Sequence, residues 1–135
     1  MKRILFLSIA LFGLVSCGEA QTTTQKKEQA KKQQTTVINK VVGQEEFEKM
    51  MKKPDAQLID VRTKDEYNAG HIGNAKNIDF YGSDFKSNMA KLDKSKPVLV
   101  YCAKGGRSGQ AASMLKEMGF KEVYDLSGGY GSWKK

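Results

Sequence analysis

The chain has 135 residues, 39% of them hydrophobic, and carries a formal net charge of +8. This length allows one domain with additional segments. The basic residues are spread thinly instead of gathering beside aromatic side chains, which argues against a nucleic-acid partner. One histidine and one free cysteine, Cys102, cannot build the usual zinc ligand set, so no metal site is expected. A modest positive field favours small anionic substrates.

Residues 1–17 have the layout of a secretion signal. Lys2 and Arg3 precede an apolar run over 4–15, which is too short to span a bilayer comfortably. Cys17 follows small residues, an arrangement that resembles the bacterial lipobox. The resemblance implies cleavage before Cys17, a lipid on its thiol, and a place in the cell envelope as a periplasm-facing or surface lipoprotein. The alternative is an ordinary signal peptide with an incidental cysteine.

Residues 18–36 are rich in Gln, Thr and Lys and contain no large apolar side chain. Such a segment cannot bury enough surface to offset its ordering entropy, so we interpret it as a flexible tether. The tether would join the membrane anchor to a globular domain over 37–135. A lipid on Cys17 would leave Cys102 as a free thiol, whereas a disulfide between the two is the usual alternative outside the cytoplasm.

Within 37–135, apolar patterns and turn residues predict alternating strands and helices. Strands are expected over 37–42, 57–61, 75–78, 97–101 and 122–126. Helices are expected over 43–53, from Thr63 (with Glu66 in a capping box) to near Gly70, over 83–92 with Ser83 as the cap, over 107–118 with Gly119 closing it, and as a last turn over 130–135.

This alternation indicates an α/β fold, with a central parallel sheet of about five strands and helices on both faces. The strand over 97–101 is apolar throughout, as is typical of a strand buried on both faces. Ligands of such sheets bind beyond the carboxyl ends of the strands. Cys102 lies at one of those ends.

The segment that follows Cys102 is rich in glycine and carries Lys104 and Arg107. Glycines let the backbone curl with its N–H groups turned inward, and a helix begins at the same place. Amide groups and nearby cations should lower the pKa of the thiol and keep it ionised, as a nucleophile. The alternative is that Cys102 is a small hydrophobic residue of the core.

Three ordered motifs resemble the rhodanese family and cover nearly all of 37–135. They are Leu58–Arg62 with Glu66-Tyr67 and Gly70–Ala75; Tyr101-Cys102 with Arg107-Ser108; and Gly119-Phe120 with Leu126–Tyr130 and Trp133. The resemblance implies a rhodanese fold and makes Cys102 the residue that forms a persulfide. It also implies a substrate cradle made of Ala103, Lys104, Gly105, Gly106, Arg107 and Ser108.

The resemblance further implies a sulfurtransferase without a cofactor. It would move a sulfane sulfur from a small anionic donor, such as thiosulfate, to cyanide or to a thiol, for example that of a thioredoxin-like protein. Rhodanese-fold phosphatases and arsenate reductases have a loop one residue longer than the four residues between Cys102 and Arg107, so they are the weaker enzymatic alternative. A sulfur carrier or binding module without turnover is a further alternative.

Four polar residues of the first motif are expected to support the structure: Asp60, Arg62, Glu66 and His71. We expect Arg62 to pair with Glu66, which follows it by four positions. For Asp60, a role as acid or base is the alternative. The imidazole of His71 should bond to backbone groups of a turn, with catalysis as the alternative. Lys104 is expected to attract the anionic substrate.

Overall fold

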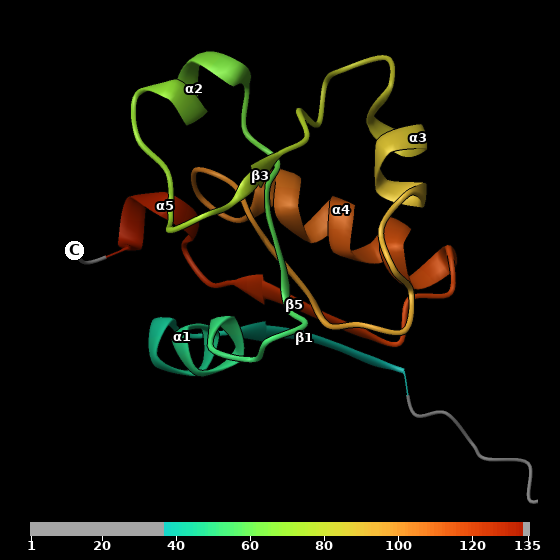
Figure 1. The fold of residues 1–135 in the computed structure, drawn as a ribbon. Helices are drawn as coiled ribbons and strands as arrows, with labels where there is room; N and C mark the ends of the chain where they lie inside the picture. The colour runs from blue at the N-terminus through green and yellow to red at the C-terminus, as the bar shows by residue number, and fades with distance from the viewer. Residues whose placement is uncertain (1–36, 134–135) are drawn as a thin grey trace, which may run out of the picture. The chain divides into compact units, whose positions relative to one another are not determined.

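The computed structural model describes residues 37–133, in which strands and helices alternate along the chain (Figure 1). The expected signal peptide, tether and lipidated Cys17 lie outside the described residues. None of the helices in the described part is long and apolar enough to cross a membrane. The strands are β1 (Ile38–Val42), β2 (Gln57–Asp60), β3 (Lys76–Asn77), β4 (Val98–Tyr101) and β5 (Glu122–Leu126); the helices are α1 (Gln44–Met51), α2 (Lys64–Asn68), α3 (Phe85–Ala90), α4 (Gly106–Glu117) and α5 (Gly129–Ser132).

The five strands form one sheet in the order β1-β5-β4-β2-β3, and every neighbouring pair is parallel. This confirms the predicted five-stranded parallel sheet. Strand β4 lies at the centre, with Val100 opposite Ile59 of β2 on one side and Asp125 of β5 on the other. All four residues of β4 are buried. The carboxyl end of the central strand, which Cys102 follows, therefore lies in the buried interior of the sheet.

Each face of the sheet carries its own hydrophobic core, because side chains alternate along the strands. Val98, Val100 and Cys102 pack in one core with side chains of α3 and α4. Leu99 and Tyr101 pack in the other, with side chains of α1, α2 and α5. Helices thus cover both faces, as predicted. Burial of a Val or Leu side chain contributes roughly 1.5–3 kcal/mol, so both faces hold β4 firmly in place.

The sequence prediction is right for the start of α2 and wrong for the start of α3. The capping box of α2 is confirmed: Thr63 Oγ1 accepts from the Glu66 amide, and the Glu66 carboxylate accepts from the Thr63 amide. The expected Ser83 cap of α3 is wrong, since the helix begins at Phe85 and has no capping side chain. A turn in which the Phe85 amide donates to the Gly82 carbonyl takes the place of the expected first residues of the helix.

Helix α5 holds the segment that follows β4. The amide of Tyr130 donates to the carbonyl of Cys102 at 2.7 Å, and that of Gly131 to the carbonyl of Ala103 at 3.0 Å. This close contact between the backbone of α5 and the backbone after β4 requires glycine at position 129, where φ is +58°. A Cβ there would meet the Cys102 carbonyl oxygen and main-chain atoms of Ala103 and Lys104. The chain after β5 and the chain after β4 are therefore packed backbone against backbone.

Replacing Gly129 by Ala should destabilise the protein. A side chain in the left-handed region costs about 1–2 kcal/mol, and the main-chain atoms that the new methyl meets cannot move without deforming the loop. We expect the free energy of unfolding, measured by urea denaturation, to fall by at least about 3 kcal/mol.

The matched control is Gly43→Ala. Gly43 precedes α1 with φ −73°, and a Cβ there would meet nothing within 4 Å. Gly43→Ala should lower the free energy of unfolding by no more than about 1 kcal/mol, which is the scale of an N-cap change. Equal losses in the two variants would show that the backbone contact of Gly129 contributes nothing.

Candidate functional site

Cys102 directly follows the central strand, and its side chain belongs to the core beneath α4, together with Ala111 and Ala112. The residue is 2% exposed. The sheet and α4 pack against this side chain, and the loop that follows β4 lies against its sulfur atom. Space is open beside the glycines of that loop, since a Cβ at Gly105 or Gly106 would meet no atom within 4 Å. The cysteine thus packs as a core residue beneath a loop with open space beside it.

Hydrogen-bond donors converge on the sulfur. The Gly105 amide donates to Cys102 Sγ at 3.0 Å, and Ser108 Oγ lies 3.4 Å from it. Burial raises the pKa of the thiol, but the Ser108 hydroxyl and the amides of Ser108, Lys104 and Gly105 outweigh it, so that the pKa of Cys102 is lowered overall. Gly105 permits this curl because its φ is +103°. The loop therefore favours the thiolate.

Arg107, the first side chain of α4, is turned toward α2. Its guanidinium donates to both carboxylate oxygens of Glu66, at 2.7 and 2.8 Å. The expected pairing of Arg62 with Glu66 is therefore wrong: the fold brings Arg107 to that carboxylate and engages Arg62 elsewhere. Because Arg107 is paired, its charge is largely compensated. The pair fixes the start of α4, and hence the loop, against the capped start of α2.

Arg62 is buried and forms a two-pronged ion pair with Asp60, with Nε and the terminal nitrogen at 2.6–3.0 Å from the carboxylate oxygens. It also donates to the Gly70 carbonyl at 2.6 Å, and its guanidinium lies 4.0 Å from the centre of the Tyr130 ring. Burial lowers the pKa of Arg62, but Asp60 more than offsets this and raises it. These contacts join β2, the loop after α2, and α5.

The sole histidine of the chain lies in the loop after α2. His71 is exposed, stacks on the Tyr67 ring with 4.0 Å between ring centres, and places Nδ1 3.2 Å from the Tyr67 carbonyl oxygen. An Nδ1–H donating to that carbonyl agrees with a role in the turn. Within residues 37–133, no group of three or more His, Cys, Asp or Glu side chains is arranged to hold a metal ion.

The structure brings the predicted loop residues together around Sγ, but their side chains do different things. Ser108 faces the sulfur, Arg107 faces Glu66, and Lys104 is exposed. The glycines and Ala103 contribute backbone alone. Among the side chains of residues 103–108, Lys104 carries the positive charge that is not paired with a carboxylate, and the inward amides add partial positive charge beside the sulfur.

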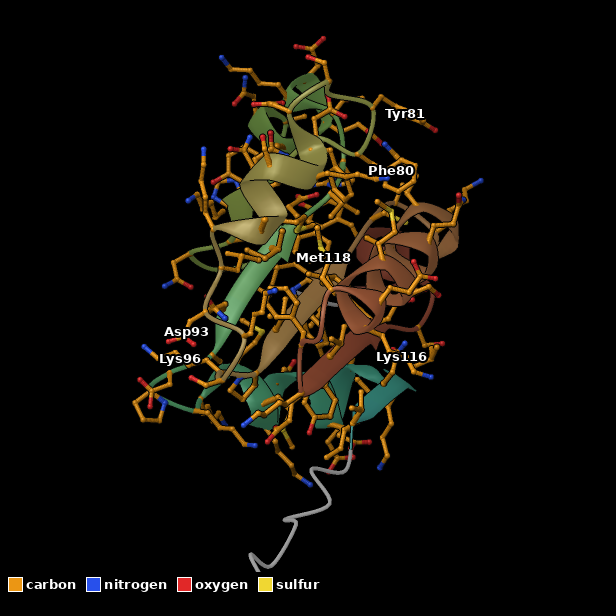
Figure 2. All side chains as sticks on the ribbon, turned by 90° about the vertical axis from the view of Figure 1, so that its right-hand side faces the viewer. Phe80, Tyr81, Asp93, Lys96, Lys116 and Met118 are labelled. Atoms are coloured by element: carbon orange, nitrogen blue, oxygen red, sulfur yellow. The ribbon has the colours of Figure 1, made fainter. Side chains whose placement is uncertain are left out.

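Sequence reasoning missed two residues beside this loop. Tyr81 is 71% exposed, and its ring lies 5.6 Å from the Arg107 guanidinium carbon. With Phe80 it forms an aromatic rim, seen at the upper right of Figure 2. Asp125 is buried in β5, on the face toward Ser108. Two sequence features could have indicated them: the aromatic pair that precedes Gly82, and an acidic residue inside an otherwise apolar strand.

A pocket of about 280 Å³ opens between the segment after β3 and α4, on the flank that faces the viewer in Figure 2. Phe80, Phe85, Lys86 and Met114 contribute to its wall. Cys102 does not line it. The pocket therefore belongs to the surface beside the aromatic rim and not to the immediate surroundings of the sulfur atom.

Comparison with known proteins agrees with this geometry. Residues 43–135 match the model of the rhodanese-like domain. The chain therefore belongs to the rhodanese-like family, as the three motifs indicated.

Particular relatives refine this assignment. The chain is similar to the thiosulfate sulfurtransferase GlpE of Coxiella burnetii, with 42% identity over 95 residues, 70% of this chain and 87% of that protein. It is 39% identical over 87 residues to a tRNA uridine(34) hydroxylase of Cytophaga hutchinsonii, covering 62% of this chain but 28% of that protein. A solved rhodanese-related protein from Thermoplasma volcanium has a TM-score of 0.61 at 29% identity, covering 70% and 89%. The first relative matches over most of its length and supports a sulfurtransferase type.

The pairing of Glu66 predicts a pH-dependent contribution to stability. The hydrogen bonds from Arg107 lower the pKa of Glu66 to about 2, although burial opposes them. Its folded pKa thus lies below the unfolded value, so the stabilisation is present above the unfolded pKa and is lost as the pH falls through about 2. Glu66→Gln should lower the free energy of unfolding by about 1 kcal/mol at pH 7, given partial exposure, and by progressively less in acid.

The control for this prediction is Glu45→Gln, which breaks the exposed pair of Glu45 with Lys49 at 3.2 Å in α1. Its effect at pH 7 should be no more than about 0.5 kcal/mol. Denaturant unfolding at several pH values measures both. A Glu66 variant whose loss does not change with pH would argue against the ion pair as its cause.

Proposed function

We propose that this protein is a thiosulfate sulfurtransferase, in which Cys102 carries the transferred sulfur as a persulfide. The observation that supports this most directly is the set of donors around Cys102 Sγ, which lower its pKa while the fold buries it. A thiolate is the form that attacks sulfane sulfur. The same donors suit a persulfide, which is also an anion. The similarity to GlpE points to the same chemistry.

The reaction would proceed in two displacements. First, the Cys102 thiolate attacks the outer sulfur of thiosulfate; a new S–S bond forms, the old one breaks, and sulfite leaves with its electron pair. Second, an acceptor thiolate or cyanide attacks the outer sulfur of the persulfide and regenerates the Cys102 thiolate. No proton transfer is needed if donor and acceptor arrive as anions. The inward amides of the loop stabilise negative charge in both steps.

We further propose that the protein works at the cell envelope, with a lipid on Cys17 as its anchor. The motif before Cys17 supports this, and lasting attachment requires the several acyl chains of a lipoprotein. The acceptor would then be a small thiol or a thiol protein outside the cytoplasm. In this arrangement Cys102 is the sole free thiol of the mature chain.

Cys102→Ser should abolish sulfur transfer without unfolding the domain, because Ser has nearly the same volume but is not ionised at neutral pH. The measurement is thiocyanate formation from thiosulfate and cyanide by the full chain. Activity should fall by at least about 10³-fold, the usual loss of a nucleophile. Retained turnover in this variant would refute the persulfide mechanism.

Mass spectrometry of the intact protein separates turnover from simple carriage. After treatment with thiosulfate, the wild type should gain the mass of one sulfur atom, and Cys102→Ser should not. Loading followed by release of the sulfur to cyanide indicates a transferase. Loading without release would indicate a carrier and would contradict the enzymatic proposal.

Cys17→Ser serves as the matched cysteine control and tests the anchor. It leaves Cys102 in place, so sulfur transfer should persist. Incorporation of labelled fatty acid in a bacterial host should be seen in the wild type and lost in this variant. Equal labelling in both proteins would exclude Cys17 as the site of lipid attachment.

A further inference from the structure

The charged residues of the domain are divided unequally between the two edges of the sheet. Because every strand is parallel, the segments that precede the strands lie at one edge, and those that follow the strands lie at the other, with Cys102. We define the amino edge as residues 52–56, 91–97 and 118–122 together with the start of β1. It holds six lysines against three acids, so its net charge is positive: Lys52, Lys53, Lys91, Lys94, Lys96 and Lys121, with Asp55, Asp93 and Glu122.

The opposite edge of the sheet has the reverse balance. Residues 43–46, 61–66, 78–84 and 102–108 follow β1, β2, β3 and β4, and they hold six acids against four basic residues. Two of these four basic residues are arginines already paired with carboxylates. The domain is therefore an electrical dipole, and its positive end lies at the edge remote from the sulfur atom.

Contacts between segments make the amino edge one continuous surface. Lys96, near the lower left of Figure 2, places Nζ 3.7 Å from Asp55 Oδ1, which joins the segments before β4 and β2. The amide of Lys121 donates to the carbonyl of Lys94 at 3.3 Å, and the carbonyl of Lys121 accepts from the Ile38 amide at 2.7 Å. The segment before β5 thus lies between the segment before β4 and the start of β1. The lysines therefore act together on one side of the domain.

Most of the positive charge of the amino edge is free to act on a partner. In the described part of the chain, Lys52, Lys91, Lys94 and Lys121 are exposed and have no carboxylate within ion-pair distance. The other two lysines form partly exposed ion pairs, which are weak. Carbonyl ends of α1, α3 and α4 also lie at this edge, but their partial negative charge falls off within one turn, whereas lysine side chains extend further.

The covalent connection of the domain indicates which partner lies near this edge. Residues 18–36 run from the proposed lipid on Cys17 to Val37, which precedes β1 at the amino edge. A segment of this length spans at most about 65 Å, so the anchor alone would let either edge face the bilayer. Charge would decide between them, because each lysine close to an anionic surface shifts the equilibrium toward contact about fivefold.

We propose that the amino edge binds the anionic head groups of the membrane that holds Cys17, so that the edge with Cys102 faces away from the bilayer. The inference rests on the proposed lipid anchor, to which it adds a binding surface and an orientation. The acidic balance of the opposite edge supports it, because an anionic membrane repels that edge. In this orientation, thiosulfate and acceptor thiols reach the loop after β4 from the aqueous side.

The test is acetylation of the lysines of the full lipidated chain by a water-soluble succinimidyl ester, with each site quantified by mass spectrometry. The protein is inserted into vesicles of phosphatidylcholine alone or of phosphatidylcholine mixed with phosphatidylglycerol. Lys52, Lys94 and Lys121 should react at least about threefold more slowly on the mixed vesicles, and high salt should abolish this protection. Lys64 and Lys104, at the opposite edge, should react equally on both. Equal rates at all five lysines, or protection of Lys64 and Lys104 instead, would overturn the proposal.

Charge reversal identifies the residues responsible. The combined change Lys52→Glu, Lys94→Glu and Lys121→Glu breaks no ion pair and should remove the protection, which Lys53 and Lys91 then report. Thermal unfolding checks that the variant is folded. Protection that persists in the folded variant would contradict the proposal. If the variant does not fold, the two vesicle types and the salt dependence of the wild type decide the question alone.

The matched control combines Lys64→Glu, Lys76→Glu and Lys86→Glu. These exposed lysines lie away from the amino edge, are likewise without an ion-pair carboxylate among the described residues, and give the same change in net charge. The control should keep the protection of the amino edge. Equal loss of protection in both triple variants would show that net charge alone is responsible, and the proposed surface would be wrong.

The anchor is measured separately by incorporation of fatty acid, so the two proposals can fail independently. A chain without lipid on Cys17 that shows the same protection on mixed vesicles would keep the surface and exclude the anchor. A lipidated chain with uniform rates would do the reverse. Thiocyanate formation reports sulfur transfer independently of both.

Discussion

A sulfur atom buried at the end of the central strand can remain negatively charged only if hydrogen-bond donors replace the water that it has lost. The loop after β4 meets this requirement with amides of Lys104, Gly105 and Ser108 and with the Ser108 hydroxyl. Much of the surrounding structure keeps these donors in position. Strand β4 fixes the position of Cys102, and the start of α4 supplies amides that face the sulfur. Amides of α5 bind the carbonyls of Cys102 and Ala103.

The two ion pairs beside the loop have different environments and different effects. Asp60 and Arg62 are buried, and their pair joins β2 to the segments that carry Gly70 and Tyr130. Removing one partner of such a pair leaves an uncompensated charge in the core. Glu66 and Arg107 are partly exposed and fix the start of α4. In the proposed reaction, attraction of the anionic donor would be left to Lys104 and to backbone amides, so selectivity for charge and shape would come mainly from the main chain.

The parts of this site that are contiguous in the sequence could be predicted from it. The apolar run before Cys102, the glycines after it and the capping box at Thr63 are local patterns, and local geometry decides them. The partner of Glu66 could not be predicted, because Arg107 lies 41 positions away and reaches it only after α4 docks. Asp125 could be noticed as an acid in an apolar strand, but its burial beside Gly109 depends on how α4 packs against β5. Ser83 failed as a cap because a turn replaced the first residues of a short helix.

The contact between α5 and the loop has a consequence for folding. The carbonyls of Cys102 and Ala103 bind amides of Tyr130 and Gly131, which follow them by almost thirty residues in the sequence. Until α5 packs against the loop, the loop lacks the partners that hold its curl. The folding chain would therefore carry an ordinary, weakly reactive thiol until the segment after β5 has reached its place.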